Sequence, residues 1–313
     1  MVVELLKRAM PYLCLEKFGQ AKSLPANNTQ AMKFRRYNAL SLRTTPLTEG
    51  VTPTSEKLTA SDITAQLYQY GGLVEITDII MDTHEDPVLK EAVAVVGEQA
   101  AKTIETLRYN VLKACTNVFY ANSVAGRSSV VALISRTDQR RIVRALERQE
   151  AQFITSIVKS TPKFNSESIL PAFVGVTHVD MTSDIRGLDG FTSVADYGTM
   201  PAWETEIGAC EDVRYLKSTI FTPYEDAGSA TTTGKITTNG TGCDVYPVMY
   251  FGRDAFGVIA LKGKFSIVPV VINPVPSKSD PLGQRGSVSW KTMQGTVILN
   301  DAWMAVYEAA CTS

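Results

Sequence analysis

The feature that most constrains the fold is a long apolar stripe in the middle of the chain. Its members recur at intervals of three or four positions: Leu89, Val93, Val96, Ala100, Ile104, Leu107, Val111, Cys115 and Val118. That spacing is typical of one face of an α-helix. Asp86 followed by Pro87 is a favourable helix start, with an N-cap and then a proline. We therefore predict one helix from Pro87 to about Ala121, about 50 Å long.

Upstream of this helix the sequence predicts a long hairpin. Residues 33–43 and 63–80 have strand character, and Leu40 and Leu42 alternate with polar residues in the first run. The segment 44–61 between them is polar and lacks regular structure. Connections of this length are uncommon in compact domains and are often functional. We predict an arm that projects and lies on a neighbouring subunit; a mobile surface loop is the alternative.

Glycines and turn-forming residues shape the parts around this hairpin. Gly71-Gly72 interrupts the second strand and predicts a bulge or kink there. Residues 19–31 have turn composition and predict an extended, exposed arm near the amino terminus.

A second helix is predicted over residues 137–158. One face is partly apolar, and the opposite face carries Arg140, Arg141, Arg144 and Arg148. Glu147 and Glu150 lie among these arginines, so much of the charge is expected to be paired within the helix. We therefore expect the basic face of this helix to be solvated or to contact another subunit rather than to bind nucleic acid.

Beyond this helix the sequence is rich in strand signals. Strands are expected at 169–179, 213–221, 244–252, 256–263 and 265–272, and alternation returns over 287–310. Residues 225–242 are rich in Thr and Gly and predict a flexible surface insertion.

Composition excludes several functions. The 313 residues carry a formal net charge of −1, so no whole-chain affinity for nucleic acid or for an anionic membrane is expected. The apolar stretch at the start of the sequence is too short for a membrane span, and its charged residues do not fit the layout of a signal peptide. The five cysteines are scattered, with no Cys-x-x-Cys pair, and indicate free thiols in a reducing cytosol.

Searches for catalytic motifs find none that fits. The stretch 228–236 has five residues between its glycines and Ile236 where a phosphate-binding loop needs a hydroxyl. Asp82, His84, Glu85 and Asp86 have the chemistry of metal ligands, but the start of a helix favours carboxylates without any metal. His178 is expected to be structural. We predict no catalytic residue, no cofactor and no metal; an enzyme with an unrecognised site is the alternative.

Residues 279–293, SDPLGQRGSVSWKTM, combine turn and strand signals. Pro281 and Gly283 predict a turn, and Trp290 in the following strand is expected to pack inward against the long helix. The charged residues Asp280, Arg285 and Lys291 are expected to form ion pairs at a subunit or domain border.

The order of these parts resembles the major capsid proteins of tailed bacteriophages, which have the Hong Kong 97-like fold. Several stretches are similar to the capsid protein family of Enterobacteria phage N-four: THVDMTSDIRGLDGFTSVADYG (177–198), ETEIGACEDVRYLKST (204–219), DVYPVMYFGRDAFGVIALKG (244–263) and SDPLGQRGSVSWKTMQGTVILNDAWMAVYEAA (279–310). The family often has His-Pro where this chain has His178-Val179, and a glycine where it has Glu211 or Asp212.

The resemblance implies an α+β fold with five parts. These are an N-terminal arm with the first hairpin strand (1–43), an elongated hairpin or E-loop with its returning strand (44–80), a peripheral P-domain with the long spine helix (81–124), a mixed α/β A-domain (125–284) and a C-terminal return to the P-domain (285–313).

The resemblance also implies a function. Copies of the chain are expected to form pentamers and hexamers of an icosahedral shell around double-stranded DNA. The expected partners are a portal protein and possible scaffolding and decoration proteins, and no membrane is involved. Assembly is expected in the host cytoplasm, and the final location is the virion. An encapsulin-like nanocompartment shell is the alternative. The expected inter-subunit contacts are Leu47, Glu49, Lys57, Arg140, Arg144, Asp280 and Arg285.

Overall fold

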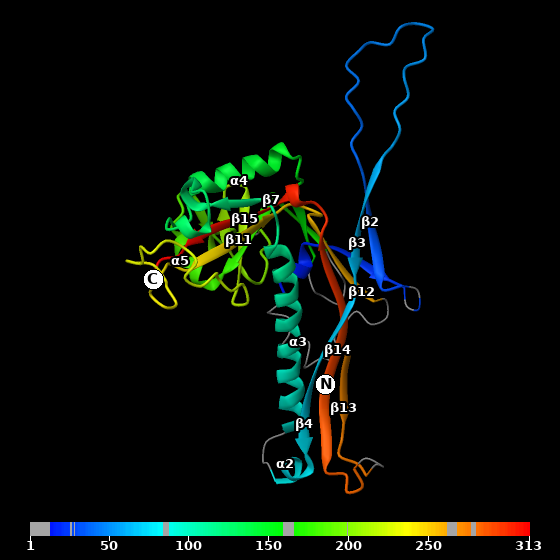
Figure 1. The fold of residues 1–313 in the computed structure, drawn as a ribbon, viewed down its shortest axis with the longest axis vertical. Coiled ribbons are helices and arrows are strands. Elements are labelled where there is room, and N and C mark those ends of the chain that lie inside the picture. Colours follow the sequence, from blue (N-terminus) through cyan, green and yellow to red (C-terminus); the bar gives the residue numbers. More distant parts are fainter. Residues whose placement is uncertain are drawn as a thin grey trace.

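The long helix expected from the apolar stripe is present as α3 (Val88–Lys113) and forms the vertical axis of the molecule in Figure 1. The computed structural model describes residues 13–25, 27, 29–83, 88–158, 166–198, 200–261, 268–276 and 280–313. The expected cap at Asp86 and the acidic side chains of 82–86 lie outside the described residues. No helix in the described part is long and apolar enough to cross a membrane.

The helix ends earlier than the stripe predicts. Val118–Tyr120 form a short strand, β5, which pairs in parallel with β15 (Met304–Ala310) near the end of the chain. Asn117 and the β-branched and aromatic residues after it are poor helix formers, and Val118, Phe119 and Tyr120 are good strand formers. The pairing with β15, which local sequence cannot reveal, converts this segment from helix to strand.

One face of α3 packs against a five-stranded sheet. Its strands are β1 (Gln20–Leu24), β12 (Phe256–Leu261), β14 (Arg285–Ile298), β13 (Val268–Ile272) and β4 (Tyr68–Thr77). The apolar stripe of α3 meets buried residues of β4 and β14, as the periodicity predicts; the buried cluster is Ile76, Val93, Val96, Ala100, Ile104, Val288 and Trp290. The expected strand over 63–80 stops at Thr77, after which α2 (Asp78–Thr83) begins.

Trp290 packs inward against α3, as predicted, and explains the glycine pair in β4. Its indole Nε1 donates to Gln99 Oε1 at 3.2 Å. A Cβ atom at Gly72 would lie 2.6 Å from that nitrogen, and one at Gly71 would lie 2.7 Å from the Trp290 carbonyl oxygen. The expected bulge is absent, because both glycines pair with β14 in unbroken register. The glycines instead permit close approach to the tryptophan.

The second sheet has eight strands, and apolar residues cover both of its faces. Along the path the order is β5, β15, β11 (Val245–Phe251), β7 (Ser166–His178), β10 (Val213–Ser218), β9 (Glu206–Cys210) and β8 (Phe191–Ser193), with β6 (Ile154–Val158) paired to β7. In β11, Val248 and Tyr250 face one cluster while Met249 and Phe251 face the other. This alternation fits a strand buried on both sides.

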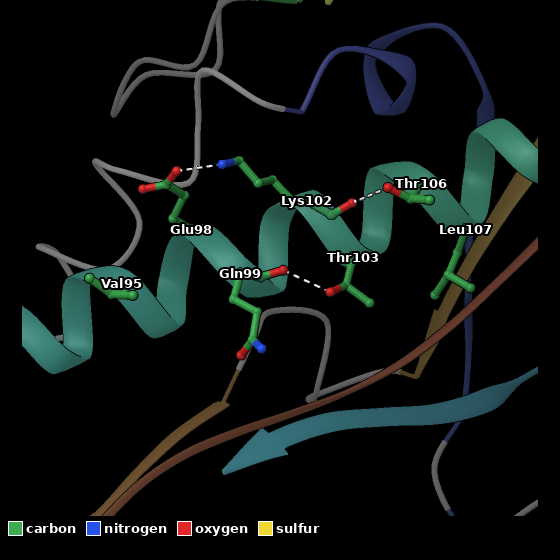
Figure 2. A pocket seen from close by; sticks show the side chains of 7 residues that line it. All are labelled: Val95, Glu98, Gln99, Lys102, Thr103, Thr106 and Leu107. Carbon is green, nitrogen blue, oxygen red and sulfur yellow. Dashed lines mark hydrogen bonds and ion pairs between the residues drawn. The ribbon is translucent and has the colours of Figure 1, made fainter. Parts of the chain in front are cut away.

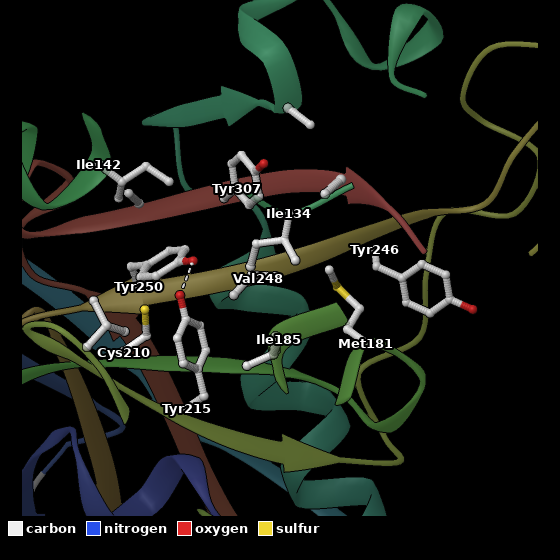
Figure 3. Packing of buried hydrophobic residues seen from close by; sticks show 14 of the residues in the cluster. Ile134, Ile142, Met181, Ile185, Cys210, Tyr215, Tyr246, Val248, Tyr250 and Tyr307 are labelled. Carbon is white, nitrogen blue, oxygen red and sulfur yellow. Dashed lines mark hydrogen bonds between the residues drawn. The ribbon is translucent and has the colours of Figure 1, made fainter. Parts of the chain in front are cut away.

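Different elements cover the two faces of this sheet. α4 (Arg136–Arg148) and α5 (Thr182–Arg186) lie on one, where the tyrosine hydroxyls of Tyr215 and Tyr250 are 2.9 Å apart (Figure 3). The end of α3 and the amino-terminal residues 14–18 pack on the other. The sheet is therefore a closed core, and helix α3 joins it to the five-stranded sheet.

The second helix is shorter than predicted. α4 ends at Arg148, and Glu150 has a φ of +57°, a left-handed conformation that stops a helix. Ile154–Val158 continue as β6 instead, because they pair with β7. Residues 149–158, expected in this helix, therefore lie outside it.

The sheets do not follow the expected boundary at residue 284. β12 and β13 precede it but belong to the sheet of α3, whereas β15 follows it and belongs to the eight-stranded sheet. The chain thus crosses between the sheets several times, which ties them together. The five-part division stays a prediction.

The amino-terminal segment is docked rather than fully exposed. β1 pairs in parallel with β12, and Leu24 is buried. Ahead of it, the fully buried Glu105 of α3 accepts hydrogen bonds from the backbone N–H groups of Cys14 at 3.1 Å and Leu15 at 2.8 Å. Arg108, one helical turn away, donates to Glu16 at 3.0 Å. Two charges of α3 therefore hold residues 14–16 against the helix.

The remaining feature is the projecting hairpin. β2 (Ala31–Tyr37) and β3 (Ala60–Gln66) pair in antiparallel register from Ala31 with Gln66 to Tyr37 with Ala60. The tip of the hairpin, residues 38–59, extends beyond the body of the molecule (Figure 1). The predicted long hairpin is confirmed, although its first strand ends at Tyr37 rather than Arg43.

Replacing Gly72 with alanine tests the contact with Trp290. The added methyl group would overlap the indole nitrogen and break its bond to Gln99, so we expect Gly72→Ala to lower the free energy of unfolding by about 1–3 kcal/mol. Urea denaturation of the unassembled subunit measures this. Gly126→Ala is the matched control, since its Cβ would meet no atom within 4 Å. Equal effects of the two substitutions would contradict the explanation.

The pH dependence of stability tests the burial of Glu105. Burial raises the pKa of this carboxyl group above its ordinary value near 4.5. The folded state therefore binds the proton more tightly than the unfolded state, and the contribution of Glu105 to stability falls as the pH rises from that value through the raised pKa. Glu105→Gln should remove this slope. If the free energies of unfolding of wild type and Glu105→Gln change in parallel between pH 4 and 8, the proposed effect of burying Glu105 is wrong.

Candidate assembly surfaces

The cysteines offer no reactive centre. All five are buried, and burial raises the pKa of each thiol, to about 12 for Cys115 and Cys311. A thiol is nucleophilic as the thiolate, so these groups are inert at neutral pH. Within the described ranges, no three His, Cys, Asp or Glu side chains are grouped so as to hold a metal ion.

His178 is held by its neighbours. Its Nδ1 accepts from the backbone N–H of Asp180 at 3.2 Å and lies 3.0 Å from an Asp180 carboxylate oxygen. The ring packs near Tyr246, with centroids 5.7 Å apart. These contacts give the histidine the structural place that was expected.

The hairpin tip is the most exposed surface of the described chain. Leu47 is 77% exposed, and Glu49 and Lys57 are also exposed. The two limbs are joined at two places. The backbone N–H of Asn38 donates to the Thr59 carbonyl at 2.9 Å, and farther out Ser41 Oγ donates to Glu56 at 2.6 Å while Arg43 lies 3.7 Å from the same carboxylate. Three of the predicted contact residues therefore lie on a defined loop.

Apolar side chains gather on this tip without an apolar partner. Five large ones are at least half exposed, Leu40, Leu42, Leu47, Val51 and Leu58, and so is Tyr37 at the end of β2. Single exposed leucines are common on soluble proteins, but a cluster on a projecting loop marks an interaction surface.

The basic face of α4 forms a second surface. Arg136 and Arg140 both bind Glu211, which lies in the turn between β9 and β10, with 2.9 Å separating Arg136 Nε from the carboxylate. The expected pairing with Glu147 and Glu150 is wrong: in the described chain neither glutamate forms an ion pair, since the partner comes from a distant segment. Arg144 is exposed and forms no ion pair within the described part of the chain.

The turn around Pro281 forms a third surface. The backbone N–H of Gly283 donates to the carbonyl of Asp280 at 3.1 Å, and Gly283 has a φ of +64°, so the predicted turn is confirmed. The Asp280 carboxylate accepts from the backbone N–H of Arg285 at 2.9 Å. An ion pair of either residue with another subunit stays a prediction.

A shallow, open pocket of about 670 Å³ lies along α3 (Figure 2). Its wall is polar between Val95 at one end and Leu107 at the other. The threonine hydroxyls of the wall donate to carbonyls of their own helix, and Glu98 pairs with Lys102 at 2.6 Å. The wall therefore carries no free catalytic group; it is a shallow surface suited to contact.

The seven predicted residues fall on these separate surfaces and are not brought together in one pocket. Leu47, Glu49 and Lys57 lie on the tip, Arg140 and Arg144 on α4, and Asp280 and Arg285 at the turn beyond β13. Sequence reasoning missed a further exposed apolar set on β4 and α2, comprising Leu73, Val74, Ile79 and Ile80. The strand predicted over 63–80 includes all four, and only the lack of a covering layer in the described part of the chain distinguishes them from buried strand residues.

The described chain thus has several exposed surfaces suited to contact, and neither its thiols nor its acidic groups form a reactive centre or a metal site. The family model for phage capsid proteins matches residues 60–309, most of the chain. The chain has no match among curated proteins.

Solved structures share its fold at low sequence identity. The capsid of Ralstonia phage GP4 superimposes with a TM-score of 0.73 at 13% identity, over 94% of this chain and 87% of that one. The cyanophage Pam1 capsid gives 0.61 at 15% identity, over 96% and 92%. The head of Helicobacter pylori bacteriophage KHP40 gives 0.59 at 9%, over 93% and 87%. The chain therefore belongs to the phage capsid protein family, and it is a major capsid shell protein with the Hong Kong 97-like fold.

Proposed function

We propose that the chain assembles as pentamers and hexamers into an icosahedral shell around double-stranded DNA, with each hairpin lying across a neighbouring subunit. The observation that carries this proposal is the hairpin of residues 31–66. A two-stranded ribbon has little stability alone in water, and its tip exposes apolar side chains that its own subunit leaves uncovered. Burial against a neighbour stabilises such side chains by about 25 cal/mol for each Å² of apolar area.

The separation of the surfaces supports rings of identical chains. A head-to-tail contact needs two different surfaces on each copy, and such contacts form closed rings when the rotation between copies closes. The tip, the basic face of α4 and the turn at Asp280 are three such surfaces. We propose Leu47, Glu49, Lys57, Arg140, Arg144, Asp280 and Arg285 as residues at these contacts.

We also propose the five-part organisation of residues 1–43, 44–80, 81–124, 125–284 and 285–313. In this scheme the spine helix and its sheet form the peripheral P-domain, and the eight-stranded sheet forms the A-domain near the ring axis. The crossings of β12, β13 and β15 between sheets make the limits of the two domains interleaved rather than sequential.

The remaining partners follow from a shell that holds a genome. A near-neutral chain suits contact with DNA that is independent of base sequence and weak at each subunit, since strong positive charge would bind phosphates tightly. We propose a portal protein, and scaffolding or decoration proteins, as further partners, with assembly in the cytoplasm of the bacterial host. The family match favours this reading over a nanocompartment shell.

Deletion of residues 46–60 tests the role of the hairpin. The remaining residues 37–45 still connect Arg36 to its partner Ser61, so the subunit should keep its fold and its thermal unfolding midpoint. It should fail to form particles, which electron microscopy and sedimentation would show against wild type. Normal shells from the deletion variant would sink the proposal.

Reversing the charge of Arg144 tests the α4 surface. Because this side chain is exposed and forms no ion pair in the described chain, Arg144→Glu should change the free energy of unfolding by no more than about 0.5 kcal/mol. It should nevertheless reduce the assembled fraction in sedimentation at low salt. Arg186→Glu, also exposed and outside the proposed contacts, is the control; an equal loss of assembly in both variants would remove α4 from the interface.

A further inference from the structure

The strand β4 has an open edge that nothing in the described chain covers. Its ten residues pair with β14 on one side only. Neighbouring residues of a strand direct their N–H and C=O groups to opposite sides, so half of the backbone groups of β4 point away from β14. Leu73, 63% exposed, and Val74 are accessible beside this edge. An edge of this kind is ready to accept another strand.

In the five-stranded and eight-stranded sheets, the other strand edges are short or protected. Folded proteins blunt open edges with proline, lysine, bulges or short strands. β13 has five residues and contains Pro269, and β1 has five residues and contains Lys22. β5 and β8 have three residues each. β4 is ten residues long and has no proline, lysine, arginine or register shift.

A segment with strand character lies on the same chain, just beyond the end of β2. Residues 38–43, NALSLR, alternate as a strand does, yet the described strand β2 stops at Tyr37. The backbone N–H of Ser41 is turned toward Glu56 of the return limb. Beyond Asn38, whose N–H donates to the Thr59 carbonyl at 2.9 Å, residues 39–43 form no backbone–backbone hydrogen bond in the described chain, and Leu42 is 91% exposed.

We propose that residues 38–43 of one subunit add as a strand to the edge of β4 in a second copy. This inference rests on the proposed function and names the place where the hairpin docks. Backbone hydrogen bonds would provide affinity and the alternate side chains Leu40 and Leu42 would provide register, as in other cases of strand addition. In this arrangement β2 continues past Tyr37 to Arg43, which is where the sequence predicts that the strand ends.

The pairing must join two copies rather than fold back within one. β4 follows β3 after the single residue Leu67 and runs away from the tip. The tip and β4 of one molecule therefore lie toward its opposite ends (Figure 1). Each copy therefore donates one segment and accepts another. Identical chains linked in this way form a head-to-tail series, which is the arrangement that rings require.

Disulfide trapping in assembled particles tests the pairing. Since all five native cysteines are buried, cysteines placed at exposed positions supply the accessible thiols. We expect the double variants Leu42→Cys/Leu73→Cys or Leu40→Cys/Leu73→Cys, after mild oxidation, to give a ladder of cross-linked chains on a non-reducing gel. Testing both positions covers the two neighbouring registers that keep the same face.

Matched variants separate this arrangement from others. Leu42→Cys/Ile272→Cys places the second thiol on β13, at the protected edge of the same sheet, where Ile272 is 54% exposed; it should stay monomeric on the gel. Dimers from Leu73→Cys alone would mean that β4 pairs with β4 of another copy, and would overturn the proposal. An equal ladder from the β13 variant would do the same.

Hydrogen exchange supplies a measurement that does not depend on register. Amides of residues 38–43 and 68–77 should both become protected when wild-type subunits assemble, whereas 268–272 should change little. Particles in which 38–43 still exchange rapidly would refute strand addition while leaving the shell function intact. If wild-type subunits form no particles under any assembly condition, the proposed function itself fails.

Discussion

The contact of Glu105 and Arg108 with the amino-terminal segment is the interaction on which the rest of the structure depends. Glu105 is fully buried, and its carboxylate caps the short helical turn at Leu15. Arg108 lies 3.7 Å from Glu105 and also reaches Glu16 and Gln294 of β14. Breaking a buried pair by removing one partner typically costs about 3–5 kcal/mol, since the other charge stays buried.

The segment held in this way touches both sheets. Phe18 packs edge-on against Trp203 of the eight-stranded half, with ring centroids 5.1 Å apart, and Lys17 lies 3.6 Å from Glu204. Directly afterwards, β1 joins the sheet of α3. One dozen residues thus bridge the spine helix and the two sheets, and they fix the orientation of the surfaces that a shell must present.

The sequence alone is sufficient for the features that local periodicity controls. The stripe of α3, the long hairpin and the inward Trp290 are all present, because each depends on spacing within a short segment. The ends of elements were mispredicted where distant pairing decides them: β5 exists because of β15, and β6 because of β7. Gly71 and Gly72 are compatible with a bulge locally, and only the tryptophan opposite shows that they serve close packing.

The contact surfaces were partly predictable for the same reason. Exposed charge on α4 follows from helical spacing, but its partner Glu211 lies some seventy residues away in a β-turn. The loop 225–242 looked unconstrained, whereas backbone bonds from Gly228 to Cys243 and from Ile236 to Cys311 tie it to the core. Whether an apolar strand residue such as Leu73 is covered depends on the layers around it, which no local pattern encodes.

The crossings of the chain between sheets also determine the order in which a newly made subunit can fold. β4 pairs with β14, and β5 with β15, so both partners come from the last thirty residues. While the ribosome is still producing the chain, the hairpin of residues 31–66 can close, but β4 has no neighbour and neither sheet is complete. Such long-range pairing makes folding slow. A half-made chain therefore lacks the finished surfaces of a shell subunit until β14 and β15 have been synthesised.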